Sequence, residues 1–279
     1  MAPGPYRALL LDLDGTLVTD EGHIHPRTLA RLHALHASGV RVMIATGRSE
    51  LGVATVLEAL SMDTPAVVFN GAGLFCPVER RLLEERLLSD RVVHRALEFV
   101  RSSGLMPVFQ VAGAKYTPHP RDEHEHSAVR GLEGLRTVAP AELPREYVIR
   151  ITFFSARHPS SDALAAEVEA AIDQPLHVTH FPLNALATHR ASPLLVADVQ
   201  PPCRGKGEAL RVLEERYGIP RAQVVAIGDA DNDLPMLASA GYAVAMENSM
   251  PRVLAAARRV IGNNNSDTIA ELVDELFPV

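Results

Sequence analysis

The sequence ALLLDLDGT, residues 8–16, is an apolar run that ends in two carboxylates and a glycine. Ala8–Leu13 is continuously apolar apart from Asp12, which is the pattern of a short strand buried on both faces of a parallel sheet. Asp12 and Asp14 are two residues apart at the end of this strand, so both side chains can face one crevice beyond the sheet. Gly15 permits a sharp exit that other residues resist. The stretch therefore predicts the first strand of an α/β sheet with acidic groups at its carboxyl end.

The residues that follow alternate between helical and strand patterns. A helix is predicted after Pro26, with Leu29, Leu32 and Leu35 on one face and Gly39 at its end. The next predicted elements are a strand at Val40–Ala45, a helix at Glu50–Leu60 and a strand at Ala66–Phe69. This strand–helix–strand order predicts a Rossmann-like, doubly wound parallel sheet, and thus the α/β class.

The last third of the chain shows the same alternation. Predicted strands are Leu194–Val199, Gln223–Ile227 and Tyr242–Ala245, and predicted helices are Gly207–Tyr217, Leu234–Ala238 and Thr268–Leu276. We expect these elements to continue the sheet begun at the N-terminal end.

The middle of the chain has a different character. It shows a helix between Ser89 and Gly104, a second helix at about 160–172, a polar loop-rich stretch at Pro118–Pro144, and strand-like runs at Met106–Val111, Val148–Phe154 and Leu176–Phe181. We interpret it as an inserted α+β domain. The predicted division is a core of residues 1–74 and 193–279 and an insertion of residues 75–192.

Composition excludes several classes of protein. The 279 residues include 27 Lys and Arg against 34 Asp and Glu, a formal net charge of −7, with no basic block. Nucleic-acid or anionic-membrane binding is therefore not expected, and no apolar run reaches the roughly 18 residues that span a bilayer. Two cysteines, Cys76 and Cys203, are too few for a disulfide framework. We expect a cytoplasmic protein with reduced thiols.

Two motifs near the N-terminal end carry polar groups suited to phosphate chemistry. Asp12 and Asp14 could bind Mg²⁺, and one could attack phosphorus while the other moves protons. Thr46-Gly47-Arg48 closes the second strand, where a hydroxyl and successive backbone N–H groups can hold phosphate oxygens. Each has a simpler interpretation: an Asp-Gly turn for the first, and a helix N-cap by Thr46 or Ser49 for the second.

Two further motifs lie in the last third. Lys206, within Arg-Gly-Lys-Gly at residues 204–207, could neutralise a phosphoryl group or a carboxylate pair, although the frame of a P-loop is absent. Asp229 follows a predicted strand in Gly-Asp-Ala-Asp-Asn-Asp, residues 228–233, and could complete a metal site with the first motif. A solvated lysine and an acidic N-cap loop, particularly at Asp231, are the simpler interpretations. Together the four motifs supply the parts for metal-assisted phosphoryl transfer to and from an aspartate.

In these four motifs, in this order, the sequence resembles the haloacid dehalogenase superfamily of phosphohydrolases, and in the position of its inserted domain the Cof-like group. Secondary similarities are Asn-Gly-Ala at residues 70–72 and Ala-Met-Glu-Asn at residues 245–248. The resemblance implies a Mg²⁺-dependent phosphatase with a cap domain that closes over the site. It departs from relatives at Gly205, where Ser or Asp is common, and at Glu247, where Gly is common.

The resemblance also implies a role for each motif residue. Asp12 would be the nucleophile and Asp14 the acid/base. Thr46, with Gly47, and Lys206 would bind the transferring phosphoryl group, and Asn232 would lie near it. Mg²⁺ would be held by the Asp12 carboxylate, the main-chain carbonyl of Asp14 and Asp229, with support from Asp233.

The expected substrate is a small phosphomonoester, with sugar phosphates first and nucleotide or cofactor phosphates second. A phosphomutase of the same superfamily and a sensor that binds phosphate ligands without turnover remain open alternatives. The sequence does not indicate an oligomeric state. A metal role for His119, His124 and His126 in the polar loop is weakly supported. Arg150 and Arg157 could contact substrate from the inserted domain, although arginines that flank strands are usually surface residues.

Overall fold

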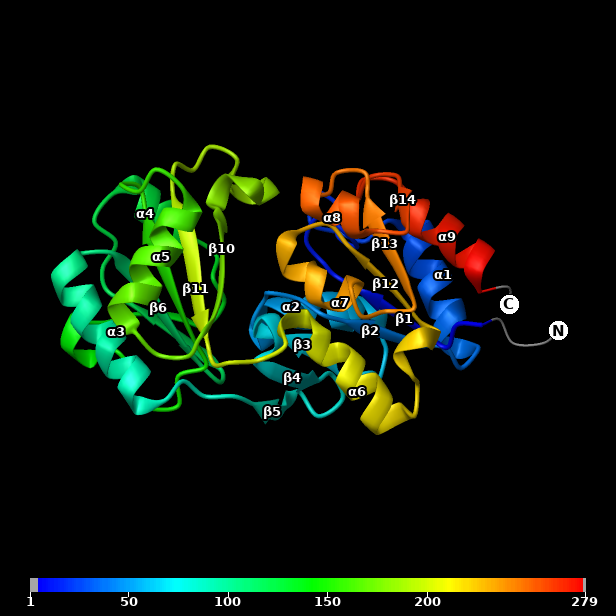
Figure 1. Cartoon of the computed structure of the whole chain (residues 1–279), viewed down its shortest axis with the longest axis horizontal. Helices are drawn as coiled ribbons and strands as arrows, with labels where there is room; N and C mark the ends of the chain where they lie inside the picture. The colour runs from blue at the N-terminus through cyan, green and yellow to red at the C-terminus, as the bar shows by residue number, and fades with distance from the viewer. Residues whose placement is uncertain (1–4, 278–279) are drawn as a thin grey trace. The chain divides into compact units, whose positions relative to one another are not determined.

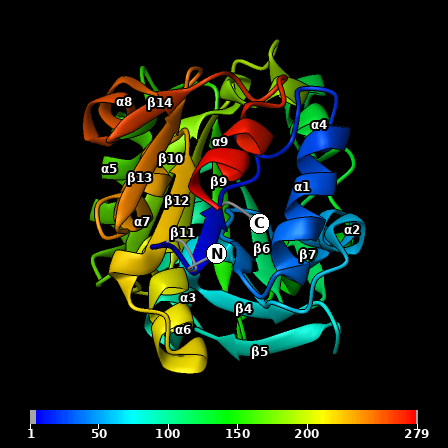
Figure 2. The same cartoon turned by 90° about the vertical axis from the view of Figure 1, so that its right-hand side faces the viewer.

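The computed structural model describes residues 5–277 and divides them into two compact units (Figures 1 and 2). The core unit comprises the chain up to Ser49, Val53–Glu84 and the chain from Arg204 onward, and the inserted unit comprises Glu50–Gly52 and Glu85–Cys203. The chain thus passes between the units at 84/85 and 203/204, compared with the expected positions 74/75 and 192/193. A β-hairpin at residues 73–85 extends the core unit before the first crossing, and a strand at residues 195–200 extends the inserted unit before the second.

The core unit contains a five-stranded parallel sheet in the order β14-β13-β12-β1-β2. A single parallel bridge between Ala45 and Val67 places β3 beside β2. The strands are β1 Ala8–Leu11, β2 Arg41–Ile44, β3 Ala66–Val68, β12 Val224–Gly228, β13 Tyr242–Met246 and β14 Arg259–Ile261. The order runs in one direction from β1 through β2 to β3 and in the other from β12 to β14. The predicted doubly wound parallel sheet is confirmed.

Helices cover both faces of this sheet. The helices of the core unit are α1 Pro26–Ala37, α2 Glu50–Leu60, α6 Glu208–Tyr217, α7 Leu234–Leu237, α8 Pro251–Ala256 and α9 Thr268–Leu276. Ala8 and Leu10 pack against α6, α7 and α8 in one apolar cluster, while Figures 1 and 2 show α1 and α9 side by side on the other face. All four residues of β1 are fully buried, as expected for a strand covered on both faces.

A hairpin follows β3 and explains the later crossing into the inserted unit. β4 (Gly73–Cys76) pairs antiparallel with β3, and β5 (Arg81–Glu85) is the third strand of this small sheet. The sequence pattern at residues 73–85 is short and polar at its tip, so the hairpin was not predicted. It keeps the chain in the core unit for about ten residues beyond the expected crossing.

The inserted unit is built on a six-stranded mixed sheet in the order β10-β11-β9-β6-β7-β8. Its strands are β6 Met106–Val111, β7 Ala114–Thr117, β8 Leu135–Thr137, β9 Arg150–Ser155, β10 His177–Pro182 and β11 Leu195–Gln200, and its helices are α3 Asp90–Ser103, α4 Glu123–Val129 and α5 Ser161–Ile172. Helix α3 begins at the predicted N-cap, where the Ser89 side chain accepts the Val92 N–H, and ends at Gly104 in a left-handed conformation.

The strand at residues 195–200 corrects one prediction. We assigned Leu194–Val199 to the core sheet, but β11 pairs antiparallel with β9 and β10 inside the inserted unit. A buried apolar run has the same local pattern in either sheet, so its partner strands are determined by contacts remote in sequence.

The polar stretch Pro118–Pro144 is more ordered than expected. Asp122 caps the short helix α4 by accepting the Glu125 N–H, and β8 adds a further strand. His124 and His126 therefore lie on a helix at positions i and i+2, which do not share a face.

One face of the inserted sheet is apolar, and the other carries polar side chains beside a second apolar cluster. Phe109, Ile151, Phe153, Ala197 and Val199 pack with α3 and α5 in one core cluster. Alternation along each strand sends their neighbours to the opposite face. There, Arg150 is buried, which contradicts its expected place at the surface, whereas the Arg157 side chain is half exposed.

Candidate active site

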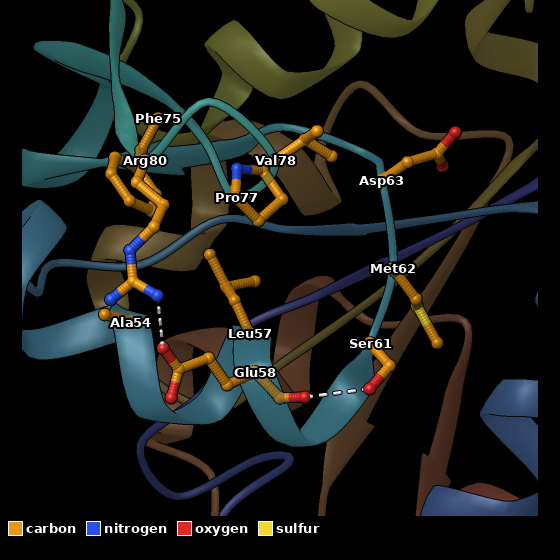
Figure 3. Close-up of a pocket in the computed structure, with 10 residues that line it drawn as sticks. All are labelled: Ala54, Leu57, Glu58, Ser61, Met62, Asp63, Phe75, Pro77, Val78 and Arg80. Atoms are coloured by element: carbon orange, nitrogen blue, oxygen red, sulfur yellow. Dashed lines mark hydrogen bonds and ion pairs between the residues drawn. The ribbon is translucent and has the colours of Figure 1, made fainter.

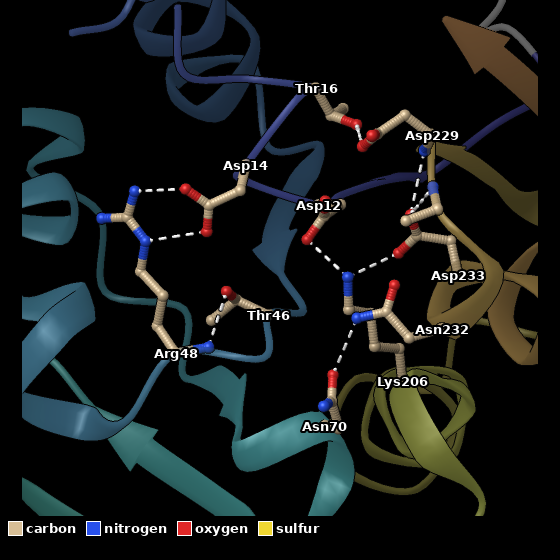
Figure 4. A network of polar contacts seen from close by, with 11 residues as sticks. Asp12, Asp14, Thr16, Thr46, Arg48, Asn70, Lys206, Asp229, Asn232 and Asp233 are labelled. Atoms are coloured by element: carbon tan, nitrogen blue, oxygen red, sulfur yellow. Dashed lines mark hydrogen bonds and ion pairs between the residues drawn. The ribbon is translucent and has the colours of Figure 1, made fainter. Parts of the chain in front are cut away.

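The predicted site residues of the core unit gather at the carboxyl ends of its central strands (Figure 4). Asp12 follows β1, Thr46 follows β2, and Asp229 follows β12. The strand order reverses between β1 and β12, and ligands of open α/β sheets bind at this reversal because the loops on either side diverge there. The fold therefore places the four motifs around one point.

A buried lysine joins two of the motifs. Nζ of Lys206 lies 2.6 Å from Oδ1 of Asp12 and 2.6 Å from Oδ1 of Asp233. The three side chains are 1%, 4% and 0% exposed, so this is an ion-paired cluster removed from water. Removing one partner of such a cluster leaves an uncompensated buried charge.

Burial and mutual repulsion raise the proton affinity of the acids. Burial, and then the neighbouring Asp233, raise the pKa of Asp12 well above its usual value, although Lys206 opposes the shift. Burial and Asp233 likewise raise the pKa of Asp229 to about 7. For Lys206, burial alone would lower the pKa, but the carboxylates of Asp12 and Asp233 outweigh it and the pKa is raised. With three acids and one lysine, the cluster holds more negative than positive charge when all of its groups are ionised.

The acids fit a divalent cation. Asp12, Asp229 and Asp233 each offer a carboxylate oxygen, and these oxygens lie within 4.8 Å of one another. Carboxylate oxygens are the hard ligands that Mg²⁺ takes, and one lysine does not neutralise three carboxylates, of which Asp12 and Asp233 are buried. Asp14 is not in this group, and its predicted contribution is a main-chain carbonyl. The donor set therefore suits Mg²⁺.

Close backbone approach explains the glycine of the first motif. Gly15 has φ of +79°, and a Cβ there would lie 2.4 Å from Oδ2 of Asp229. Oγ1 of the following Thr16 donates a hydrogen bond of 2.7 Å to Oδ1 of Asp229. Gly15 thus lets the loop after β1 meet the loop after β12.

Asp233 stabilises the loop that carries Asp229. Its Oδ2 accepts the backbone N–H groups of Asp229 and Ala230, both at 2.9 Å, while its other oxygen accepts Lys206. Asp231 instead lies at the surface, where it pairs with Arg252. Nδ2 of Asn232 donates to Oδ1 of Asn70 at 3.0 Å.

Sequence reasoning missed the partner of Asp14. The Arg48 guanidinium donates from Nε to Oδ2 of Asp14 at 2.9 Å and from Nη2 to Oδ1 at 2.6 Å, a bidentate pair that orients the carboxylate. The Arg48 backbone N–H donates to Oγ1 of Thr46 at 3.1 Å. The hydroxyl hydrogen of buried Thr46 can therefore point elsewhere. Arg48 belongs to the Thr46-Gly47-Arg48 motif, but no local pattern in the sequence links it to Asp14, which lies 34 positions away.

Asn70 is the second residue that sequence reasoning left without a role in the site. It has φ of +49°, and a Cβ on Gly47 would lie 3.1 Å from its Oδ1. A Cβ on the next residue, Gly71, would lie 2.2 Å from the Gly205 carbonyl oxygen. Asn70-Gly71 therefore packs directly between the Thr46 loop and the Lys206 loop.

Other candidate sites do not coincide with this cluster. The metal-ligand group found among residues 5–277 contains no histidine, and thus none of His119, His124 and His126. Figure 3 shows a pocket of about 300 Å³ lined by the end of α2 and the β4–β5 hairpin, crossed by an ion pair between Glu58 and Arg80. It includes no residue of the acidic cluster. No helix in the described part of the chain is long and apolar enough to cross a membrane.

Comparison with known proteins shows the family. A model of the haloacid dehalogenase-like hydrolases matches residues 9–273, so this chain belongs to that family. It is 30% identical over 249 residues to the HMP-PP phosphatase of Cronobacter sakazakii, covering 88% of this chain and 85% of that protein. It is 28% identical to the pyridoxal phosphate phosphatase of Escherichia coli, covering 96% and 97% of the two chains. The predicted family and enzyme class, a hydrolase of the phosphatase type, are confirmed.

Solved structures share the fold over nearly the whole chain. A haloacid dehalogenase-like hydrolase from Bacteroides thetaiotaomicron superposes with a TM-score of 0.80 at 24% identity, covering 98% of this chain and all of that one. At this identity the likeness supports the predicted fold class.

Lys206→Met should destabilise the core unit, because it leaves Asp12 and Asp233 buried without their cation. We expect a loss of about 3–5 kcal/mol in the free energy of unfolding, measured by urea denaturation in EDTA at neutral pH. Asp233→Asn in the same chain should restore part of the loss by removing one of the unpaired charges. If the double variant is no more stable than Lys206→Met, the ion-paired description of the cluster is wrong.

Proposed function

We propose that this protein hydrolyses a small phosphomonoester through an aspartyl-phosphate on Asp12 and requires Mg²⁺. The observation that carries the proposal is the buried cluster of Asp12, Lys206, Asp233 and Asp229, with Asp14 oriented beside it by Arg48. It supplies a nucleophile, a proton-transfer group and compensation for phosphoryl charge within one site.

In the first half-reaction, a carboxylate oxygen of Asp12 attacks phosphorus and the bond from phosphorus to the ester oxygen breaks. Asp14 gives its proton to the departing alkoxide. The Lys206 ammonium and the Thr46 hydroxyl bind the phosphoryl oxygens, where negative charge develops. Mg²⁺, held by Asp12, Asp229 and Asp233 and by the Asp14 carbonyl, would supply further charge neutralisation.

In the second half-reaction, Asp14 is a carboxylate and takes a proton from water, whose oxygen attacks the same phosphorus. The bond between phosphorus and the Asp12 oxygen breaks, inorganic phosphate leaves, and Asp14 is again protonated. Arg48 keeps Asp14 aimed through both steps because its two contacts restrain both carboxylate oxygens.

We further propose that the inserted unit acts as the cap and recognises the leaving group, and that this group is a sugar. The support is a polar cluster on the inserted sheet, formed by Gln110, Arg150, Thr152, Asp198 and Gln200. All five side chains are buried. Donors and acceptors of this kind pair with the hydroxyl groups of a sugar. The relatives named above are an HMP-PP phosphatase and a pyridoxal phosphate phosphatase, so cofactor phosphates are the second class to test.

Most of the polar cluster is internally hydrogen-bonded, but Gln200 is not. Arg150 donates to Gln110 at 3.1 Å and to Asp198 at 3.4 Å, and Gln110 donates to Thr152 at 3.2 Å. Both polar atoms of the fully buried Gln200 amide lack a hydrogen-bond partner among the described residues. Because buried polar groups are almost always paired, the Gln200 amide has hydrogen bonds to offer a ligand.

The proposed activity is tested by phosphate release from a panel of phosphomonoesters, with Mg²⁺ and with EDTA. The panel contains sugar phosphates, nucleotides, pyridoxal phosphate, flavin mononucleotide and an aryl phosphate. We expect Mg²⁺-dependent release with a sugar phosphate preferred. Release that needs an added sugar bisphosphate would indicate a mutase, and binding without release would indicate a sensor.

Asp12→Asn and Asp14→Asn should separate the two chemical roles. With an aryl phosphate, whose leaving group needs little protonation, Asp14→Asn should still incorporate acid-labile phosphate but release it about 10²–10⁴-fold more slowly. Asp12→Asn should incorporate none. Label on the Asp12→Asn protein would rule out the nucleophile assignment, and normal turnover by Asp14→Asn would rule out the acid/base assignment.

Gln200→Leu should raise the KM for the preferred sugar phosphate by about 3–15-fold, since roughly one hydrogen bond is lost. The KM for the aryl phosphate should stay within twofold. Thr137→Val, on strand β8 at the opposite edge of the same sheet, is the control and should change neither value. Equal effects on both substrates would remove Gln200 from leaving-group recognition.

A further inference from the structure

Two asparagine-containing segments outside the four motifs contact the loop that follows β1. The first is the turn after β13, with Asn248, and the second is the turn after β14, with Asn263, Asn264 and Asn265. Neither was given a role from the sequence.

Asn248 links these two segments through its amide. Its Nδ2 donates to the Gly15 carbonyl oxygen at 2.8 Å, and its Oδ1 accepts the Asn264 backbone N–H at 3.3 Å. A carbonyl needs a donor and an N–H needs an acceptor, so the two neighbours admit one orientation of the amide. The Asn248 amide therefore connects the Asn264 N–H on the turn after β14 to the Gly15 carbonyl in the loop that carries Asp14.

The same turn also holds the loop that carries Asp229. The Met250 backbone N–H donates to the Asp229 carbonyl oxygen at 2.8 Å, and Oγ of Ser249 donates to the Gly228 carbonyl oxygen at 3.4 Å. Three consecutive residues, Asn248 to Met250, thus restrain the loops after β1 and after β12 together.

Asn264 holds the next part of the β1 loop. Its side chain is buried, and Nδ2 donates to the Val18 carbonyl oxygen at 2.9 Å and to Oδ1 of Asp20 at 3.2 Å. The neighbouring Asn265 accepts the Asp20 backbone N–H at 2.9 Å. The loop is therefore anchored from the same side at Gly15, Val18 and Asp20.

These contacts from outside the loop restrain the backbone at Gly15, which glycine leaves flexible. The residue joins Asp14 to Thr16 and has φ of +79°, and a Cβ there would collide with Asp229, so a stiffer residue cannot replace it. Glycine gives the backbone more freedom than any other residue. Hydrogen bonds inside the loop, from the Thr16 and Val18 N–H groups to the Leu13 carbonyl, leave the Gly15 carbonyl to an outside contact, and the Asn248 side chain makes that contact.

We propose that Asn248, oriented by Asn264, is a positioning residue for the reaction: it holds the Gly15 peptide so that Asp14 keeps its place relative to Asp12 and Asp229. The inference rests on the proposed function for its kinetic consequence. Its structural consequence is independent of activity, because it concerns the mobility of the loop itself.

The kinetic test uses leaving groups that differ in their need for a proton. Asn248→Ala should lower kcat for the preferred alkyl phosphate about tenfold more than for the aryl phosphate, with each KM within twofold, because a misplaced Asp14 impairs proton transfer. Asn248→Asp should show the same selectivity, since it keeps the shape but loses the donor to Gly15. Equal losses on both substrates, or a change confined to KM, would overturn the proposal.

The structural test is hydrogen exchange of the Mg²⁺-loaded protein. Amides in peptides covering residues 12–19 should exchange faster in Asn248→Ala, including Thr16 and Val18, whose N–H groups donate to the Leu13 carbonyl. Asn263→Ala is the control, because the Asn263 side chain accepts the Asn265 N–H and forms no hydrogen bond with the described residues of the β1 loop. Unchanged exchange at residues 12–19 would overturn the proposal, whereas an inactive wild type with faster exchange in Asn248→Ala would overturn the proposed function alone.

Discussion

The buried ion pairs of Lys206 are the constraint on which the site depends. Two carboxylates, Asp12 and Asp233, can be buried beside Asp229 because one ammonium lies 2.6 Å from each of the first two. That arrangement requires the ends of β1 and β12 and the loop before α6 to meet within hydrogen-bond reach. Buried charges that lack a partner are costly, so the rest of the core unit must hold these three segments in register.

Glycines and backbone contacts make that approach possible. Gly15, Gly71 and Gly228 each lie where a Cβ would come within 2.5 Å of another residue of the site. The missing side chains therefore leave room for the close approach of these residues. The cost is flexibility at those glycines, which the Asn248 and Asn264 contacts offset from outside.

The cluster of Asp12, Asp229, Asp233 and Lys206 contains more acidic than basic groups, and this excess fits the binding of a cation. With burial and Asp233 raising the pKa of Asp229 to about 7, the cluster is poised to accept positive charge. A metal ion and a phosphoryl group bring opposite charges, and the same residues can accommodate both. The division of the chain into a core unit and an inserted unit separates this chemistry, which the family shares, from the polar cluster that we propose selects the leaving group.

The sequence by itself determined many of the helices and strands and indicated the candidate site residues, because periodicity, caps and motifs are local. The strand at Met106–Val111, the helix at Thr268–Leu276 and the ends of α3 at Ser89 and Gly104 were predicted correctly. The tertiary structure alone decided the partner sheet of β11, the pairing of Arg48 with Asp14 and the tether from Asn248 to Gly15. These contacts join residues distant in sequence, 233 positions apart in the last case, and no local pattern encodes which distant group a side chain will meet.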